Sequence, residues 1–460
     1  MRRAVRDRTS TSCRYAAAVI EVLKHRTYRH LLAAQVIALV GTGLLTVALG
    51  LLAYDLAGAD AGVVLGNALA IKMLAYIGVA PVVGAYANRL PRRAFLVAMD
   101  LIRCVIALCL PFVTEIWQIY FLIFFLQSAS AGFTPTFQAT IPDVLPNEAE
   151  YTRALSLSRL AYDMESLTSP ALAAALLTVM SFHWLFAGTA VGFICSALLV
   201  ISVSLPRSRA TASKGGIWQK TTWGARIYLR TPRLRGLLAV TLAAAAGSAM
   251  IIVNTVVIVK ALFQRDQSDV ALALACYGGG SMVAAFILPK LLDRVSDRSV
   301  MLPAAGALAV LLGSFAAVFY SGAITWPVLL AGWFLMGVAY SCSVTPGGRL
   351  LRRSSREEDR PALFAAQFAL SHACWLIAYP LAGWIGEGRG QFAAFAVLAG
   401  IALIGSLGGL ALWPRRDPEA LPHTHDDLPQ DHPHQAEHRA TRGHAFVIDE
   451  LHTRWPRAGA

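Results

Sequence analysis

The sequence is poor in charged residues, which make up only 15% of its 460 positions, while hydrophobic residues make up 56%. A soluble domain carries about 25% charged residues, so this composition excludes an ordinary soluble enzyme and a disordered chain. The net charge of +13 does not indicate a nucleic-acid partner, because the basic residues lie between long apolar runs and not on a polar domain.

Two further absences narrow the class. Seven cysteines, an odd number, lie mostly inside apolar runs, which argues against a disulfide framework. The sequence also has no Gly-x-x-x-x-Gly-Lys-Ser/Thr loop for nucleotide phosphates. We therefore expect no enzyme activity and no cofactor, and any active transport would draw its energy from an ion gradient.

Long apolar runs dominate what is present. A spanning helix needs roughly 20 mainly apolar residues, and residues 299–348 contain no Lys, Arg, Asp or Glu at all. Since twelve such helices would leave a soluble protein without polar surface, the sequence predicts an all-α membrane protein in the lipid bilayer. The twelve expected spans are residues 31–54, 62–86, 94–113, 116–140, 153–179, 183–205, 236–260, 269–292, 300–320, 325–346, 361–386 and 391–413.

The basic residues predict the orientation of the chain. Lys and Arg are concentrated in alternate loops, above all in residues 206–235, which hold eight of them and no acid. Short loops rich in Lys and Arg face the cytoplasm. We therefore expect a multi-pass protein of the cell inner (plasma) membrane with both termini in the cytoplasm.

The two halves of the predicted bundle repeat each other. Thr134-Pro135 matches Thr345-Pro346 and Ser169-Pro170 matches Tyr379-Pro380, at offsets of 211 and 210 residues. Parallel repeats of helices are a transporter architecture with the substrate site between the halves. The expected domains are a cytoplasmic N-terminal segment (1–30), two six-helix bundles (31–205 and 236–413), a basic cytoplasmic linker between them (206–235) and a disordered, histidine-rich cytoplasmic tail (414–460).

The loop after the second span resembles the loop motif of the major facilitator superfamily, and the resemblance extends over about residues 28–413. It implies that superfamily's fold of two six-helix halves. Asn88 stands where the family usually has Asp, whereas the corresponding loop of the second half keeps an Asp-Arg pair. The motif residues are Gly84, Asn88, Arg89, Arg92 and Arg93 in the first half and Asp293 and Arg294 in the second.

Ionisable residues inside spans are costly and mark functional candidates. Asp100 and Arg103 are i, i+3 neighbours that can neutralise each other, so we interpret them as structural. The carboxylates of the fifth span either pair with neighbours or bind a cation or proton, and a histidine on the eleventh span can join such a site. The candidates for substrate and proton coupling are Lys72, Arg159, Asp163, Glu165 and His372.

The tail adds a metal hypothesis. Residues 415–460 hold seven of the eleven histidines, and imidazole suits nickel and similar metals. This combination resembles bacterial nickel-resistance exporters of the same superfamily, which implies efflux of Ni²⁺, or of Co²⁺, in exchange for protons. Export of a drug or siderophore is the alternative, and a solvated polar tail without metal is also open. The predicted metal ligands are His423, His425, His432, His434, His438 and His444.

Overall fold

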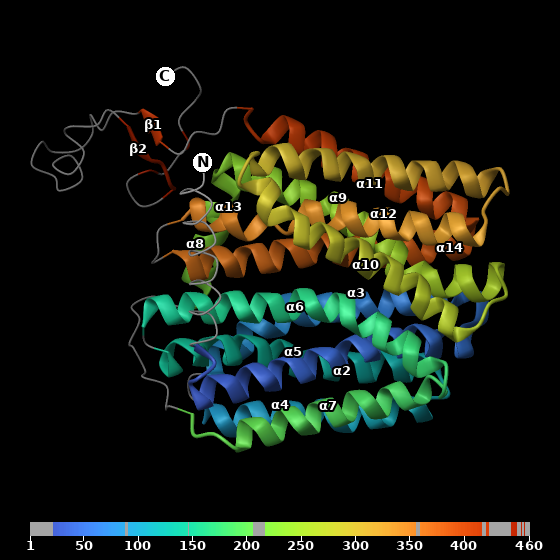
Figure 1. Ribbon diagram of the computed structural model, residues 1–460, viewed down its shortest axis with the longest axis horizontal. Coiled ribbons are helices and arrows are strands. Elements are labelled where there is room, and N and C mark those ends of the chain that lie inside the picture. The colour runs from blue at the N-terminus through green and yellow to red at the C-terminus, as the bar shows by residue number, and fades with distance from the viewer. Residues whose placement is uncertain are drawn as a thin grey trace, which may run out of the picture.

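The structure is a computed structural model that describes residues 22–87, 91–145, 147–205, 217–355, 359–415, 420–422, 443–448, 452 and 455. Long helices run side by side along one axis, and short turns join them at the two ends (Figure 1). The end at which the first of these helices begins is called the terminal end, and the opposite end is called the far end.

The helices form two groups of spans. The first half consists of α2 (Arg26–Ala57), α3 (Ala61–Ala87), α4 (Arg92–Cys109), α5 (Ile116–Val144), α6 (Glu148–Leu177) and α7 (His183–Ile201), with 3-10 turns at Gly58–Asp60 and Leu110–Phe112. The second half consists of α9 (Pro232–Val257) with a π-helical turn at Ile258–Leu262, α10 (Gln267–Leu292), α11 (Asp297–Tyr320), α12 (Trp326–Val344), the short α13 (Gly347–Arg353) and α14 (Arg360–Leu412).

The prediction of twelve spans is confirmed by these helices. Nine stretches of the described residues are long and apolar enough to cross a bilayer, and two of them, 26–79 and 362–412, are long enough to cross it twice. Gly390 divides α14, because its φ of 81° is a left-handed conformation that glycine adopts without strain. The twelfth span is α6, whose many charged residues lower its hydropathy.

Several helices are longer than the apolar runs predicted. α2 begins at Arg26 and not at residue 31, and α5 continues to Val144 and not to residue 140. Backbone hydrogen bonding does not depend on hydrophobicity, so a helix continues past the point where its side chains become polar. At the start of α5, Glu115 and Gln118 form a capping box that satisfies free amide groups.

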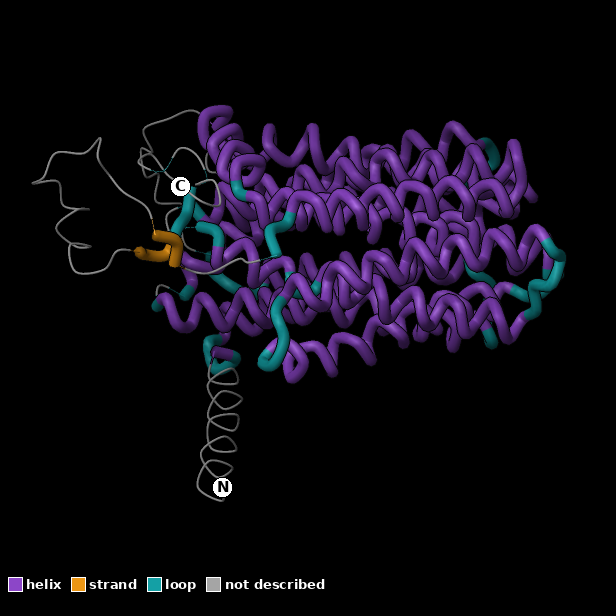
Figure 2. The backbone as a smooth tube through the Cα atoms, turned by 90° about the horizontal axis from the view of Figure 1, so that it is seen from above, coloured by secondary structure: helices purple, strands orange, loops and turns teal. Residues whose placement is uncertain are grey.

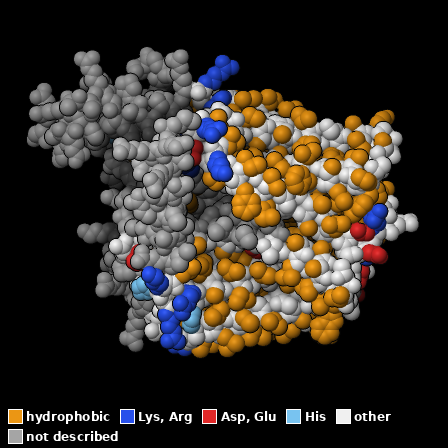
Figure 3. Space-filling model, in the orientation of Figure 1, with side chains coloured by type: hydrophobic (Ala, Val, Ile, Leu, Met, Phe, Trp, Pro, Cys, Tyr) orange, Lys and Arg blue, Asp and Glu red, His pale blue; other side chains and the backbone are white. Residues whose placement is uncertain are grey.

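The two halves face each other across the middle of the molecule. Figure 1 shows α2–α7 on one side and α9–α14 on the other, and Figure 2, seen from above, shows the long helices along one axis with the two short strands beyond one end. The contacts across the boundary come mainly from α3 against α14 and from α6 against α10. The outer surface is hydrophobic along the helices, whereas Lys and Arg side chains gather toward the terminal end (Figure 3).

The predicted linker, residues 206–235, differs from a simple loop. Residues 206–216 lie outside the described part, but α8 (Ile217–Arg230) is helical, and α9 already begins at Pro232. Trp223 Nε1 donates to Asp359 at 2.9 Å and the Tyr228 hydroxyl donates to Gln367. Burial raises the pKa of the Tyr228 hydroxyl, which keeps it a donor. α8 is therefore held against α14, which hydropathy does not reveal.

The expectation of a disordered tail is wrong for the parts of the tail that the structure describes. β1 (Ala420–Pro422) pairs antiparallel with β2 (Gly443–Ala445). Beyond β2, Phe446, Ile448 and His452 are buried, and Arg233 of α9 donates to the Phe446 carbonyl at 3.4 Å. The Arg233 guanidinium also lies 5.0 Å from the ring centroid of Trp455. Aromatic side chains thus hold this segment against the start of α9.

Candidate functional site

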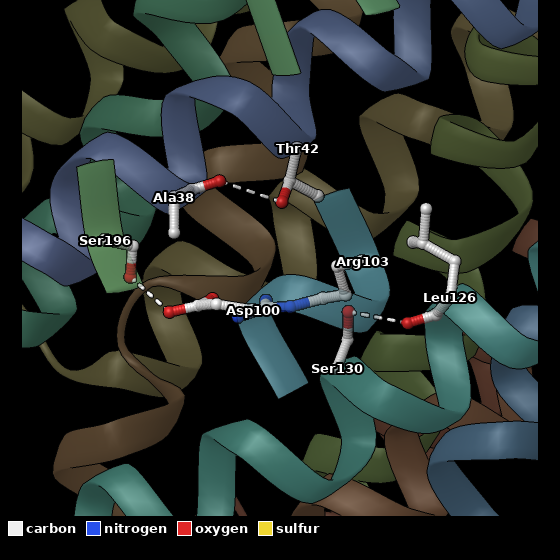
Figure 4. Close-up of polar contacts among 7 residues, drawn as sticks. All are labelled: Ala38, Thr42, Asp100, Arg103, Leu126, Ser130 and Ser196. Atoms are coloured by element: carbon white, nitrogen blue, oxygen red, sulfur yellow. Dashed lines mark hydrogen bonds and ion pairs between the residues drawn. The ribbon is translucent and has the colours of Figure 1, made fainter. Parts of the chain in front are cut away.

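One group of charged side chains inside the bundle lies among helices of the first half. Asp100 and Arg103 of α4 form the predicted i, i+3 ion pair, and both are buried. Ser196 of α7 donates to Asp100 at 2.8 Å, and the Arg103 guanidinium lies 4.3 and 4.5 Å from the ring centroids of Phe133 and Phe193. Figure 4 shows Asp100 between Ser196 and Arg103. Since every one of these groups belongs to the first half, the pair ties α4 to its neighbours there.

A second group lies at the boundary between the halves. On α3, Lys72 Nζ lies 5.7 Å from the centroid of the Tyr76 ring. The Tyr76 ring in turn contacts α14, with centroids 5.7 Å from Phe368 and 5.3 Å from His372. The His372 ring packs on Phe368 at 4.0 Å, and its Nδ1 lies 2.6 Å from the Phe368 carbonyl oxygen. Residues about 300 positions apart in the chain therefore meet here.

Glu165 of α6 brings a carboxylate to the same place. It lies close enough to Lys72 for their opposite charges to attract each other. The carboxylate rests against α2, since a Cβ added to Gly43 would lie 3.0 Å from Glu165 Oε1. On the other side, Trp375 of α14 lies 6.3 Å from His372 and is anchored by a 2.8 Å hydrogen bond to Ser248. We call these residues the interface cluster: Lys72, Tyr76, Glu165, Phe368, His372 and Trp375.

The exposure of the interface cluster indicates what it faces. Lys72, Glu165 and His372 are each half-buried, although they lie well inside spanning helices. A charged group exposed to lipid at that depth would be costly, so such groups face the bundle interior or a water-filled space. The half-burial of the interface cluster is therefore consistent with side chains that face the interior of the bundle and not the lipid.

The structure brings together three of the five predicted coupling residues. Lys72, Glu165 and His372 meet in the interface cluster, whereas Arg159 and Asp163 lie on α6 with side chains outside the described part. The prediction missed Tyr76 and Phe368. Helical spacing could have found them, because Tyr76 follows Lys72 by four residues and Phe368 precedes His372 by four, and such neighbours share a helix face.

The loop-motif residues are only partly described. Arg92 forms an ion pair with Asp143 at the end of α5, and Arg93 donates to the Ile201 carbonyl. Asn88 and Arg89 lie outside the described part, and Gly84 is described only as part of helix α3.

The second half has an ion pair at the corresponding place, but with different residues from those expected. Asp293 and Arg294 are exposed, and the pair joins Asp297 of α11 to Arg349 of α13, at 2.7 Å. An offset of 205 residues relates Arg92 to Asp297. The two halves thus carry equivalent ion pairs with the charges exchanged.

The predicted metal ligands stay a prediction. His423, His425, His432, His434 and His438 lie outside the described residues, and His444 lies in β2 with its side chain undescribed. Among the residues that are described, no group of three or more His, Cys, Asp or Glu side chains could hold a metal ion.

Twelve spanning helices in two halves, with half-buried charged and aromatic side chains between them, define a membrane transporter. The family model of the Major Facilitator Superfamily matches residues 31–264 and 237–448, so the chain belongs to that superfamily. Its members carry small molecules through the lipid bilayer. The chain is accordingly a multi-pass membrane protein.

Known relatives are distant. The chain is 25% identical over 353 residues to the uncharacterized MFS-type transporter YfiS of Bacillus subtilis (strain 168), covering 73% of this chain and 82% of that protein. It is 24% identical over 153 residues to macrolide efflux protein A of Enterococcus faecalis, covering 31% of this chain and 47% of that protein. The chain thus spans about half the length of that macrolide efflux protein.

Solved structures share the fold at low sequence identity. The nucleoside transporter NupG has a TM-score of 0.68 and 12% identity, covering 84% of this chain and all of that one (100%). A D-xylose–proton symporter has a TM-score of 0.63 and 13% identity, covering 86% of this chain and 98% of that one. At this level of identity the similarity concerns the fold alone.

Proposed function

We propose that the protein is a proton-driven exporter of an amphipathic organic compound with an aromatic part. The interface cluster is the observation that carries this proposal. Tyr76, Phe368 and Trp375 offer ring faces on which a flat apolar group can pack. Glu165 and Lys72 lie beside these rings and offer one charge of each sign for the polar part of the same molecule.

The same cluster is poorly suited to a divalent metal ion. The Lys72 ammonium would repel a dication bound at Glu165. His372 Nδ1 already lies at hydrogen-bond distance from the Phe368 carbonyl, which leaves one ring nitrogen for a ligand. Hard and borderline metals prefer several oxygen and imidazole ligands together. The partial similarity to macrolide efflux proteins also favours an organic substrate.

Glu165 is the proposed proton carrier. When α10 of the second half covers α6, the Glu165 carboxyl is shielded from water and its protonated form is favoured; when the halves move apart, water returns and the carboxyl releases the proton. This exchange couples a proton to the motion of one half against the other. It needs no nucleotide and no bound cofactor.

The proposed location is the inner membrane with both termini in the cytoplasm. Arg92, Arg93 and Arg349 lie at the terminal end of the bundle, as does the basic segment around α8. Loops rich in Lys and Arg remain on the cytoplasmic side. The interface cluster then takes its substrate from the cytoplasm.

The experiment compares accumulation of several compounds in a bacterial strain that lacks its own drug exporters. Cells that express the chain should accumulate less of a macrolide or of an aromatic organic cation. Glu165→Gln should return accumulation to the level seen in cells that do not express the chain. Glu387→Gln is the matched control, because Glu387 is an exposed carboxylate of α14 at the far end of the bundle, close to the break at Gly390. Equal accumulation of every organic compound with and without the chain would reject the proposal.

Nickel efflux is the second candidate, and the seven histidines of residues 415–460 are the observation that favours it. The same strain should then resist Ni²⁺ or Co²⁺ when it expresses the chain. A chain shortened after residue 414 should lose apparent affinity for the metal without losing transport. Metal resistance in the absence of any effect on organic compounds would establish this candidate in place of the first.

A further inference from the structure

Three glycines let α3 and α14 touch backbone to backbone at the far end. A Cβ added to Gly66 of α3 would lie 2.6 Å from the Tyr379 carbonyl oxygen. A Cβ added to Gly383 of α14 would overlap the Gly62 carbonyl oxygen and lie 2.9 Å from the Val63 Cα. Real Cβ atoms do not approach backbone so closely, so a side chain at Gly66 or Gly383 is incompatible with this contact.

Hydrogen bonds reinforce the contact from both sides. Asn67 of α3 accepts from Trp384 of α14 at 3.0 Å and donates to Tyr120 of α5 at 3.2 Å. Asn254 of α9 donates to the Ala382 carbonyl at 3.0 Å and accepts from Gln391 at 3.2 Å. The Asn67 bond joins the two halves directly, and the Asn254 bonds fix the part of α14 that carries Gly383.

The position of this contact relative to the interface cluster matters. Gly62 and Gly66 lie near the far-end start of α3, whereas Lys72 and Tyr76 lie about two to four turns further toward the terminal end. A second bond between the halves, from Gln267 to the Met180 carbonyl at 3.5 Å, also lies at the far end. These contacts join the two halves at the far end, whereas the charged residues of the interface cluster are only half-buried.

We propose that the contacts of Gly66 and Gly383 with the backbone of the opposite helix form the far-end gate of the transport cycle, which closes only because these two positions lack side chains. Transporters of this architecture work by moving one half against the other around a central site. In the closed state α3 and α14 touch at the three glycines. A methyl group at Gly66 or Gly383 blocks that contact and leaves the opposite state, open at the far end, as the favoured one.

The chain offers matched controls on the same helices. Gly78 of α3 and Gly388 of α14 have open space where a Cβ would lie, with no atom within 4 Å. Alanine at either position adds the same methyl group to the same helix without touching the opposite half. Any general effect of glycine replacement on helix rigidity appears in these controls as well.

The experiment measures the distance between the two halves at the far end in the full-length protein. Spin labels at Asp60→Cys and Glu387→Cys, both exposed positions, report this distance by pulsed electron resonance after the native cysteines are replaced. Unmodified protein should show mainly the short distance. Gly66→Ala and Gly383→Ala should shift the ratio of long to short distances about 5- to 150-fold, the usual range for such couplings. Gly78→Ala and Gly388→Ala should leave the ratio unchanged.

A milder variant covers the case in which an alanine protein does not fold. Trp384→Phe keeps an aromatic ring but removes the indole N–H that donates to Asn67, and should shift the same ratio several-fold in the same direction. Unchanged distances in Gly66→Ala, Gly383→Ala and Trp384→Phe would overturn the gate. Distances do not depend on which solute is carried, so failure of the proposed substrate would leave this result intact.

Discussion

Replacing Asp100 by Asn should destabilise the first half more than replacing both members of its ion pair. Asn keeps the shape of the side chain and a partner for Ser196, but it leaves the Arg103 guanidinium buried without its counter-charge. Removing one partner of a buried pair costs about 3–5 kcal/mol. The two phenyl rings near Arg103, Phe133 and Phe193, are present with and without the change, so they offset none of this cost.

The double variant Asp100→Asn with Arg103→Met removes the buried charge altogether. Methionine fills a similar volume with a flexible apolar chain, and the loss is then about 1–2 kcal/mol from the cation–π contacts. Unfolding in mixed detergent should rank the native protein first, the double variant second and Asp100→Asn last. The double variant should therefore be about 2–3 kcal/mol more stable than Asp100→Asn alone. If the effects of Asp100→Asn and Arg103→Met on stability are additive, the argument that the two residues form a buried, mutually dependent ion pair is refuted.

Two further predictions concern the terminal end. Arg233→Ala should release the segment around Phe446, because it removes the guanidinium that contacts this segment; limited proteolysis should then cut the tail faster, and an unchanged rate of cleavage would contradict the docking. Asp297→Arg should reduce transport by disrupting the pair with Arg349, and adding Arg349→Asp should restore it, since the first half holds the equivalent pair with exchanged charges; transport that stays low in the double variant would argue against a simple ion pair.

Most of the fold could be predicted because a helix that spans a bilayer needs a long apolar run, which is easily recognised in a sequence. Charge-free runs of about twenty residues identified the spans, and α6 was found although its charged first half makes its run less apolar. The ends of the helices were less accurate, since α2 and α5 continue into polar sequence. The helix α8 was missed because its packing on α14 depends on Trp223 and Tyr228 meeting residues more than 130 positions away.

The site could be predicted only in part. Lys72, Glu165 and His372 were identifiable singly, because charge inside a span is rare. Their meeting in one cluster depends on how the two halves face each other, which a single sequence does not encode locally. Tyr76 and Phe368 were missed for another reason. Aromatic residues are common in spanning helices, so their presence alone does not indicate a binding site. The gate glycines could not be identified from the sequence either, because only the packing of the partner helix shows at which glycine a side chain would clash.

The most direct test of the central claim is proton movement coupled to substrate in vesicles that contain the purified protein. Adding an exported organic compound to vesicles with an imposed pH gradient should release protons with the native chain and with Glu387→Gln. Glu165→Gln should bind the compound and still exchange it for labelled compound across the membrane, but should release no protons. Proton release by Glu165→Gln equal to that of the native chain would contradict the account.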